Sequence, residues 1–210
     1  MNRREFEAAQ RRTVHRGKGK QSSVYEVDWN GQRAAVKDFS RVPWLFRNLV
    51  VPLIIRREIK ALRWLDGTPG VPRFLGRVDR LAFALEYVEG TPFDQLKTGD
   101  IGPEVFPRIQ AVIDGIHARG VSHGDLKRRS NLLLTPSGEV FLIDFAAAVI
   151  GNRPLHPFAS WLQHEMEAVD RKSLPKIKKF TAPDQMTEED VRLLNTPTRL
   201  ERWARKWLGR

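Results

Sequence analysis

The sequence predicts an α+β fold, with an antiparallel sheet and one main helix first and a small, mostly helical part after them. In residues 1–89, short strand-like runs bounded by turn residues surround a single helical pattern at Ile54–Leu65. In residues 90–210, apolar residues at helical spacing dominate, most clearly at Pro103–Arg119. We therefore expect a boundary near Gly90 between two parts of one chain.

The first informative segment is Gly17–Val27, which follows a polar leader at residues 1–14. It combines glycines with a strand-like run that ends in a turn at Asn30 and Gly31, and Arg33–Phe39 is the next strand. Glycines let backbone N–H groups approach phosphate oxygens, so a glycine-rich turn between two strands can cap a nucleotide. A flexible basic turn has the same composition and stays an alternative.

One amphipathic helix is predicted in this first part, at Ile54–Leu65. Glu58 is its only acid, and its apolar residues recur at helical spacing: Ile55, Ile59, Leu62 and Leu65. The glycines and prolines of Asp66–Pro72 end the helix. Arg73–Val78 and Leu81–Val88 are the next two strands.

The second part is expected to begin with a helix start at Thr91, Pro92 and Asp94, which combine a capping side chain, a first-turn proline and an acid. A buried central helix follows at Pro103–Arg119, and Gly120 ends it. Its apolar residues at helical spacing are Val105, Phe106, Ile109, Val112, Ile113 and Ile116.

Further helices are predicted toward the end of the sequence. Helical spacing resumes at Pro157, with an apolar face made of Phe158, Trp161, Leu162, Met166 and Val169. Thr187 and Asp190 form a capping pair that opens a short helix. A last helix is predicted at Thr198–Leu208, with tryptophans on one face and arginines on the other.

An apolar hairpin is predicted at Leu132–Leu134 and Val140–Ile143, which are joined by turn residues. Asp125 and Asn131 lie just before this hairpin and Asp144 just after it, so folding brings the three side chains to one end. Two carboxylates and an amide oxygen suit Mg²⁺, with one carboxylate left to accept a proton. An ordinary hairpin with solvated charges at its ends is the alternative.

At these residues the chain resembles the protein-kinase-like superfamily, in which a catalytic loop HRDxxxxN precedes a strand pair that ends in DFG. The corresponding residues here are HGDLKRRSN, starting at His123, and DFA, starting at Asp144. GKGKQSSV, starting at Gly17, is similar to the glycine-rich loop GxGxxGxV, and Lys37 lies where that superfamily has the lysine of a VAIK strand.

The resemblance covers residues 15–150 and implies a two-lobed protein-kinase-like fold. Residues 1–89 would form a nucleotide-binding lobe, and residues 90–210 a helical lobe with the catalytic loop and metal site but no long activation segment. The compact second lobe and the glycine after His123 look more like RIO-type atypical kinases and the bacterial lipopolysaccharide core kinases that phosphorylate Kdo or heptose.

The resemblance implies a role for each matching residue. Asp125 would be the catalytic base, Lys127 would lie against the transferred phosphoryl group, and Asn131 and Asp144 would hold Mg²⁺. The residues implied to bind ATP are Gly17, Gly19, Ser22, Val24, Ala35, Lys37, Glu58, Glu86, Val88 and Leu133. Among them, Glu58 would pair with Lys37, although it could also be an ordinary exposed helix charge. His123 is interpreted as a structural histidine that braces the loop.

The chain departs from the family pattern at three places, which makes the assignment of the family's residue roles less certain there. The spacing from Asp125 to Asn131 is one residue longer than in HRDxxxxN. Ala146 replaces the glycine of DFG, and Ser22 replaces the third glycine of the phosphate loop. These departures motivate a different class of function as the alternative, a pseudokinase that serves as a nucleotide-binding or scaffold module.

The implied reaction is transfer of the γ-phosphoryl group from ATP, with Mg²⁺, to a hydroxyl of a protein Ser/Thr or of a lipopolysaccharide-core-type sugar. The formal charge of +11 attracts phosphates, nucleic acid or anionic lipid without specifying which. Because no helix-turn-helix, zinc-finger or aromatic-rich RNA-binding pattern is present, a dedicated nucleic-acid module is not expected. The sequence does not indicate an oligomeric state.

A cytoplasmic location is expected, with peripheral contact to the inner face of a membrane as an additional hypothesis. The chain has no cysteine, and neither a secretory signal nor an apolar run long enough to cross a bilayer is evident. Basic segments that carry Trp44, Phe46, Trp203 and Trp207 could favour an anionic glycolipid at a membrane surface. The alternative is that these aromatic residues pack inside the protein.

Overall fold

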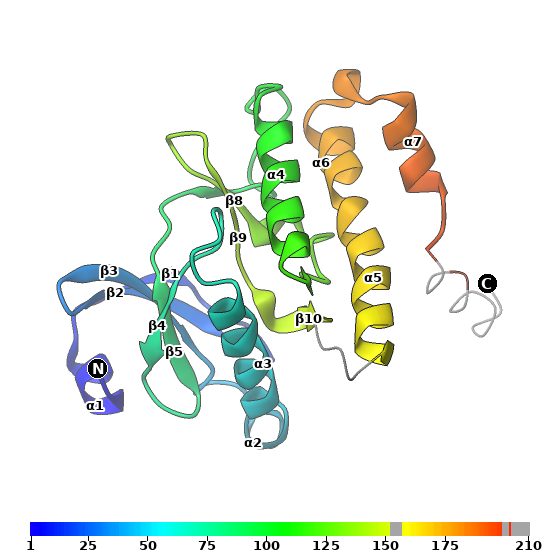
Figure 1. Ribbon diagram of the computed structural model, residues 1–210. Coiled ribbons are helices and arrows are strands. Elements are labelled where there is room, and N and C mark those ends of the chain that lie inside the picture. Colours follow the sequence, from blue (N-terminus) through cyan, green and yellow to red (C-terminus); the bar gives the residue numbers. More distant parts are fainter. Residues whose placement is uncertain (152–156, 199–201, 203–210) are drawn as a thin grey trace. The chain divides into compact units, whose positions relative to one another are not determined.

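The computed structural model describes residues 1–151, 157–198 and 202 (Figure 1). The chain divides into two compact units, of which the first comprises residues 1–67 and 71–89. The second comprises residues 68–70 together with the described residues from Gly90 onward. An antiparallel sheet and several helices make the chain an α+β protein, as the sequence predicts. The roles expected for the two parts of the chain stay predictions.

The first unit is built on a five-stranded antiparallel sheet with the strand order β1-β2-β3-β5-β4. The strands are β1 (Arg11–His15), β2 (Ser23–Trp29), β3 (Gln32–Asp38), β4 (Phe74–Arg77) and β5 (Ala82–Glu86). β2 and β3 form a hairpin through Asn30 and Gly31, whose positive φ angles of 54° and 82° fit a tight two-residue turn. All of these strands except β1 match runs predicted from the sequence.

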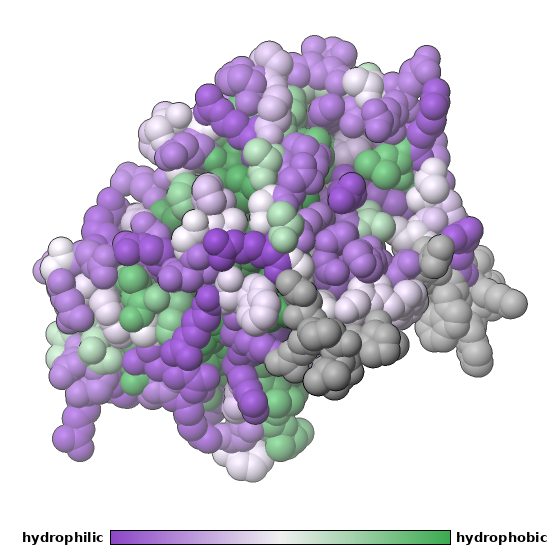
Figure 2. All heavy atoms as spheres, viewed as in Figure 1, coloured by the Kyte–Doolittle hydropathy of each residue, from purple (hydrophilic) through white to green (hydrophobic). Residues whose placement is uncertain are grey.

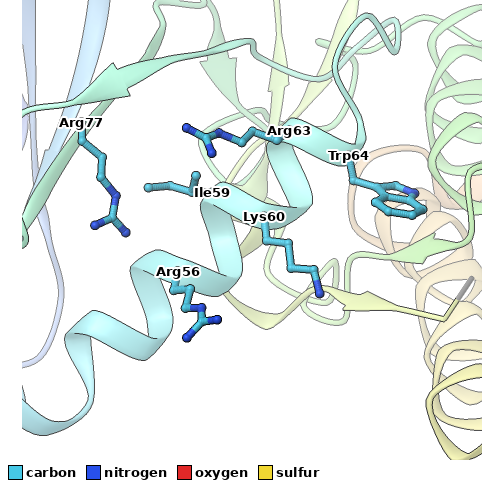
Figure 3. A pocket seen from close by; sticks show the side chains of 6 residues that line it. All are labelled: Arg56, Ile59, Lys60, Arg63, Trp64 and Arg77. Atoms are coloured by element: carbon cyan, nitrogen blue, oxygen red, sulfur yellow. The ribbon is translucent and has the colours of Figure 1, made fainter. Parts of the chain in front are cut away.

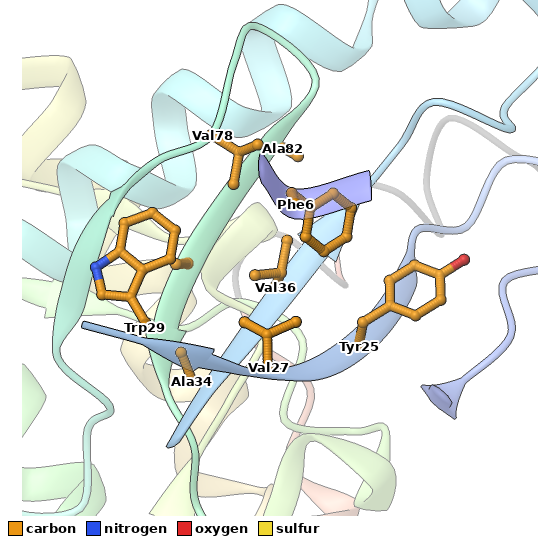
Figure 4. Close-up of a cluster of buried hydrophobic side chains, with 9 residues drawn as sticks. Phe6, Tyr25, Val27, Trp29, Ala34, Val36, Val78 and Ala82 are labelled. Atoms are coloured by element: carbon orange, nitrogen blue, oxygen red, sulfur yellow. The ribbon is translucent and has the colours of Figure 1, made fainter. Parts of the chain in front are cut away.

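Successive side chains along each strand point to opposite sides, so the sheet has two distinct faces. One face forms an apolar cluster of Tyr25, Val27, Trp29, Ala34, Val36, Val78, Ala82 and Ala84, together with Phe6 (Figure 4). Because side chains alternate along a strand, Val24 and Lys37 lie on the opposite face, where the two residues pair across β2 and β3.

The expected leader at residues 1–14 is wrong, because these residues form helix α1 (Arg3–Ala8) and most of strand β1. Phe6 is completely buried in the apolar cluster, and its ring meets that of Tyr25 edge-on. The Arg3 guanidinium donates to the carboxylates of Asp38 and Asp79 at 2.8–3.1 Å. One buried ring and one bidentate arginine therefore anchor a segment whose composition is polar.

Two helices complete the first unit. α2 (Trp44–Leu49) is short, and α3 (Val51–Trp64) covers the helix predicted at Ile54–Leu65 except for Leu65, which caps its end. Ile55, Ala61 and Leu62 of α3 are buried, as the helical spacing of its apolar residues requires.

The second unit packs helices against two small sheets. The helices are α4 (Val105–Ala118), α5 (Pro157–Arg171), α6 (Ser173–Thr181) and α7 (Glu188–Asn195). One sheet has the order β6-β8-β9, with β6 (Thr91–Pro92), β8 (Leu132–Leu134) and β9 (Val140–Leu142), and the other pairs β7 (Val121–Ser122) with β10 (Val149–Ile150). The buried face of α4 includes Ile109, Ile113 and Ile116, and Gly120 follows the helix with a φ of 70°. The central helix, the hairpin and the Thr187 capping box of α7 are confirmed.

Two expectations for this unit are wrong. Thr91 and Pro92 form strand β6 rather than a helix start, because they pair with Leu134 and Leu133 while the Phe93 N–H donates to the Leu132 carbonyl. α5 forms as predicted, but its most buried described side chains are polar, those of Gln163, Glu165 and Asp170, and Trp161 is exposed. The side chain of Phe158 and nearly all of the helix predicted at Thr198–Leu208 lie outside the described residues. In the described part of the chain, no helix is long and apolar enough to cross a membrane.

Candidate active site

The segment between β1 and β2 contains the predicted phosphate loop. A side chain at Gly17 would place its Cβ 2.3 Å from the Gln21 carbonyl oxygen and 2.6 Å from that of Ser22, so only glycine fits there. The Gly17 N–H donates to the Ser23 hydroxyl at 3.2 Å. Gly19 has a φ of +60°, a conformation that favours glycine. The backbone geometry of this turn therefore requires the first two glycines of the pattern, while Ser22 is half-buried in the third position.

Val24, Ala35 and Lys37 share the sheet face opposite the apolar cluster. Val24 pairs with Lys37 across β2 and β3, and Ala35 pairs with Leu85 across β3 and β5. Val24 and Ala35 are half-buried, whereas the Lys37 side chain is buried. This face combines small apolar groups with one amine.

Lys37 and Glu58 form a buried ion pair. The Lys37 ammonium donates to both carboxylate oxygens of Glu58, at 2.8 and 2.9 Å, and Glu58 is completely buried. This confirms the pairing expected between the two residues and excludes the alternative of an exposed helix charge. Burying two charges costs several kcal/mol even when they are well paired, so a pair of this kind is weak evidence for stability and fits a functional role.

Two of the residues implied to bind ATP, Glu86 and Val88, lie at the end of β5 and just beyond it. The Glu86 N–H donates to the Arg73 carbonyl at 2.9 Å, and its carboxylate pairs with the Arg73 guanidinium at 3.3 Å. Val88 follows β5 in a segment without regular structure and is half-buried. The Glu86 N–H is therefore used within the sheet, and the roles of both residues stay predictions.

In the second unit, Asp125 and Asn131 occupy the two ends of a compact loop. The Arg128 N–H donates to the Asp125 carbonyl at 3.3 Å, and the Asn131 N–H donates to the Arg128 carbonyl at 3.0 Å. The Asn131 side-chain amide donates to the Asp125 carbonyl at 3.0 Å. Two consecutive turns thus absorb the extra residue of this loop and still bring Asn131 against Asp125.

The hairpin places Asp144 beside Asn131. The Ile143 N–H donates to the Asn131 carbonyl at 2.9 Å, which joins the residue before Asp144 to the end of the loop. Asp144 itself adopts a left-handed backbone conformation, with φ 67° and ψ 65°. The sequence prediction that folding brings Asp125, Asn131 and Asp144 to one end of the hairpin agrees with these contacts.

The donor set at this end of the hairpin fits Mg²⁺. Since the Asn131 amide nitrogen donates to the Asp125 carbonyl, the amide oxygen is the part of this side chain that can serve as a ligand. Asp144 adds one carboxylate, and Mg²⁺ is commonly held by one or two carboxylates with water and phosphate oxygens filling its other positions.

Lys127 and Leu133 complete the predicted set. Lys127 is exposed, whereas its neighbour Leu126 is buried and anchors the loop. Leu133 lies in β8, pairs with Phe141 and Pro92, and is buried. The predicted residues therefore divide between the two units, Gly17–Val88 in the first and Asp125–Asp144 in the second.

Asp170 is a residue of this region that the sequence analysis missed. Its completely buried carboxylate accepts the N–H groups of His123 at 2.6 Å and Gly124 at 2.9 Å, and lies 3.2 Å from the His117 imidazole. Hydrogen bonds of this kind to a charged acceptor are about twice as strong as neutral ones. Asp170 therefore fixes the backbone immediately before Asp125. The sequence offered one signal of this role: an acid close to the apolar residues of a predicted helix.

Replacing Asp170 with asparagine is expected to lower the free energy of unfolding by about 2–3 kcal/mol. The amide would turn one acceptor oxygen into an NH₂ group that faces a backbone N–H, so a buried donor would lose its partner. Urea unfolding measures this change. Asp114→Asn, an exposed aspartate on α4, serves as the matched control and is expected to change stability by less than about 0.5 kcal/mol. Equal stability of the two variants would contradict the bracing role.

His123 braces the same loop from the other side, as the sequence interpretation expected. Its completely buried ring donates through Nε2 to the Ile143 carbonyl at 2.9 Å, and Nδ1 accepts a long contact of 3.4 Å from the Asp125 N–H. The ring also packs against Phe145, with 4.7 Å between centroids. A neutral imidazole thus links the loop to the residue before Asp144.

We expect the stability of the protein to fall as the pH drops below about 6.5, in part because of His123. Burial lowers the pKa of this imidazole below its ordinary value of 6.5. The unfolded chain therefore takes up the proton first, and the His123 contribution is lost at about 1.4 kcal/mol per pH unit between 6.5 and the lowered pKa. Thermal unfolding of His123→Gln as a function of pH should show a shallower dependence, whereas the control His164→Gln, at an exposed histidine, should keep the original slope. Parallel slopes for all three proteins would refute this assignment.

Comparisons with known proteins show weak similarity to kinases over about half of the chain. CBL-interacting serine/threonine-protein kinases 15 and 20 of Arabidopsis thaliana are 30% and 37% identical over 105 residues each, which are 47% and 46% of this chain and 25% and 23% of those proteins. A probable bifunctional tRNA threonylcarbamoyladenosine biosynthesis protein of Methanosarcina acetivorans is 33% identical over 124 residues, 56% of this chain and 21% of that protein. The chain thus spans about a quarter or less of these relatives, and no protein-family model matches it. This similarity supports a relationship of the chain to the kinase-like superfamily.

Proposed function

We propose that the protein is an ATP-dependent phosphotransferase that moves the γ-phosphoryl group to a hydroxyl. The observation that carries this proposal is the loop in which Asp125, Asn131 and the residue before Asp144 are joined by hydrogen bonds. This ordered set of acid, amide and acid has the composition that phosphoryl transfer requires.

The first unit contributes the groups proposed to bind the nucleotide. Gly17 and Gly19 leave the backbone open for phosphate oxygens, and the Lys37 ammonium, fixed by Glu58, supplies a positive charge. Val24 and Ala35 offer small apolar contacts for adenine on the same sheet face, and Ser22, Glu86 and Val88 complete the proposed ATP contacts of this unit. Leu133 of β8 is also proposed as an ATP contact and belongs to the second unit.

The second unit contributes the groups proposed to act on the acceptor. Asp125 would orient the acceptor hydroxyl and take its proton, while Lys127 would lie against the transferred phosphoryl group. Asn131 and Asp144 would hold Mg²⁺, which neutralises phosphate charge when it is bound. Because Asp170 and His123 fix the loop from both sides, Asp125 needs little rearrangement to reach a productive geometry.

The acceptor is either a protein Ser/Thr or a lipopolysaccharide-core-type sugar. Relatives whose names identify them as serine/threonine-protein kinases favour a protein acceptor. The formal charge of +11 favours an anionic one. Both acceptors supply the same chemical group, a hydroxyl.

Transfer of labelled phosphate from ATP into a cell extract, followed by separation of lipid, protein and nucleic acid, tests this proposal. We expect Mg²⁺-dependent label in the protein or the lipid fraction. Label in neither fraction, together with no ATP hydrolysis or autophosphorylation, would overturn the proposal and favour a pseudokinase. Ala146 in place of the DFG glycine and the longer loop are the features that motivate this second candidate.

A further inference from the structure

Helix α2 and the start of α3 present an apolar surface to solvent. Trp44, Leu45, Leu49 and Leu53 are 68%, 63%, 64% and 66% exposed. None of the residues of α2, all of which the structure describes, is buried. In Figure 2, apolar side chains gather at the lower edge of the view, over the helices labelled α2 and α3 in Figure 1. Four large exposed apolar side chains so close in sequence indicate an interaction surface.

The exposed charges of the segment that forms this surface, residues 41–64, all have one sign. Residues 41–64 contain six basic side chains, Arg41, Arg47, Arg56, Arg57, Lys60 and Arg63, and a single acid, Glu58. Because Glu58 is completely buried against Lys37, every exposed charge of this segment is positive. Leu53, Arg56, Lys60 and Trp64 recur at helical spacing, so one exposed stripe of α3 continues the apolar surface into a basic one.

A basic pocket of about 430 Å³ lies beside this stripe, within the first unit. Arg56, Ile59, Lys60, Arg63 and Trp64 of α3 and Arg77 of β4 line it. Figure 3 shows the Ile59 and Arg63 side chains extending from α3 toward the side from which Arg77 approaches. The four cationic side chains can bind an anionic group, and the aromatic and aliphatic side chains beside them can contact apolar chains attached to that group.

We propose that this surface, Trp44–Trp64 with Arg77, docks on a membrane that contains anionic phospholipid. Trp44, Leu45, Leu49 and Leu53 would enter the interface between head groups and acyl chains, and the pocket would hold a lipid phosphate. The proposal does not depend on the proposed phosphotransfer.

Charge and shape favour a membrane over other occupants. A second copy of the chain would bring two positively charged faces together in a symmetric dimer. A nucleic acid could neutralise the cations but would leave the leucines uncovered. The four apolar side chains belong to the outer sides of helices and do not line the pocket, which fits a soft planar partner better than a rigid groove-binding one.

Sedimentation with vesicles tests the proposal. The protein should bind vesicles of phosphatidylcholine mixed with phosphatidylglycerol, much more weakly those of phosphatidylcholine alone, and less at high salt. Leu49→Glu/Leu53→Glu should weaken the binding by about tenfold or more. Arg56→Glu/Lys60→Glu should weaken it by about 25-fold or more, because each cation near an anionic surface contributes a factor of about five.

Matched variants in the second unit separate this surface from general charge and hydrophobicity. Lys179→Glu/Arg192→Glu repeats the double charge reversal at exposed positions of α6 and α7, and Val191→Glu places one acid at an exposed apolar position of α7. Both variants should change vesicle binding by less than about threefold. Unfolding midpoints of all variants show whether each one is folded. No binding at low salt, or equal losses in the variants and their controls, would overturn the proposal. A dimer that Leu49→Glu dissociates, without vesicle binding, would overturn it in favour of a second copy.

Discussion

Replacing Asp144 with asparagine is expected to abolish turnover of Mg-ATP while leaving the fold intact. The carboxylate is the charged ligand of the proposed Mg²⁺ site, and the amide has the same shape without the charge. Asparagine also tolerates the left-handed conformation of residue 144, where φ is 67°. A loss of at least about a hundredfold in ADP release is therefore expected from the chemistry alone.

A coupled assay of ADP release and a thermal unfolding curve measure the two parts of this prediction. Asp184→Asn is the matched control, because Asp184 is an exposed aspartate of the same unit, in the short 3₁₀ helix Pro183–Gln185. The control should keep the wild-type rate and unfolding midpoint. Full activity of Asp144→Asn would remove Asp144 from the proposed Mg²⁺ site.

Replacing Asp125 with asparagine should leave nucleotide binding nearly intact while transfer to the acceptor collapses. The amide cannot accept the hydroxyl proton, and general-base catalysis contributes about 10²–10⁴-fold. Only the carbonyl of Asp125, which the substitution keeps, is bonded to the Asn131 amide. The loop that carries Asn131 should therefore retain its shape.

Titration of a fluorescent ATP analogue and transfer of labelled phosphate distinguish the two effects. The substitution also removes the contact of 3.2 Å between Asp125 and the exposed Arg128 guanidinium. Arg128→Gln removes only that contact, and an exposed ion pair contributes at most about 1 kcal/mol. Transfer that fell equally in Arg128→Gln and Asp125→Asn would contradict the role of Asp125 as a base.

Local patterns predicted the elements whose partners lie close in sequence. Strand-like runs on both sides of the turn at Asn30 and Gly31 predicted the β2–β3 hairpin. Apolar runs on both sides of a second turn predicted the β8–β9 hairpin. The helical spacing of apolar residues predicted α3 and α4, and those residues form the buried faces of the two helices. The Lys37–Glu58 pair could be predicted only from the resemblance to the kinase-like superfamily, which pairs a lysine of one strand with a glutamate of the helix.

Elements that depend on distant partners were not predictable in this way. Phe6 and Arg3 are anchored by residues of β2, β3 and the β4–β5 turn, so the composition of residues 1–14 could not reveal their place in the fold. Thr91 has the local features of a helix cap, yet its pairing with Leu134 decides its conformation. Asp170 lies in a helix that was predicted from its apolar spacing alone, and that spacing does not show that the distant N–H groups of His123 and Gly124 require an acceptor there.

The left-handed backbone at Asp144 makes the aspartate that the proposed chemistry needs less favourable for stability than glycine would be. A residue with a side chain held at φ 67° costs about 1–3 kcal/mol, a penalty that glycine does not incur. Selection for heat resistance alone would therefore favour glycine at this position, and a library screened only for folding should enrich it.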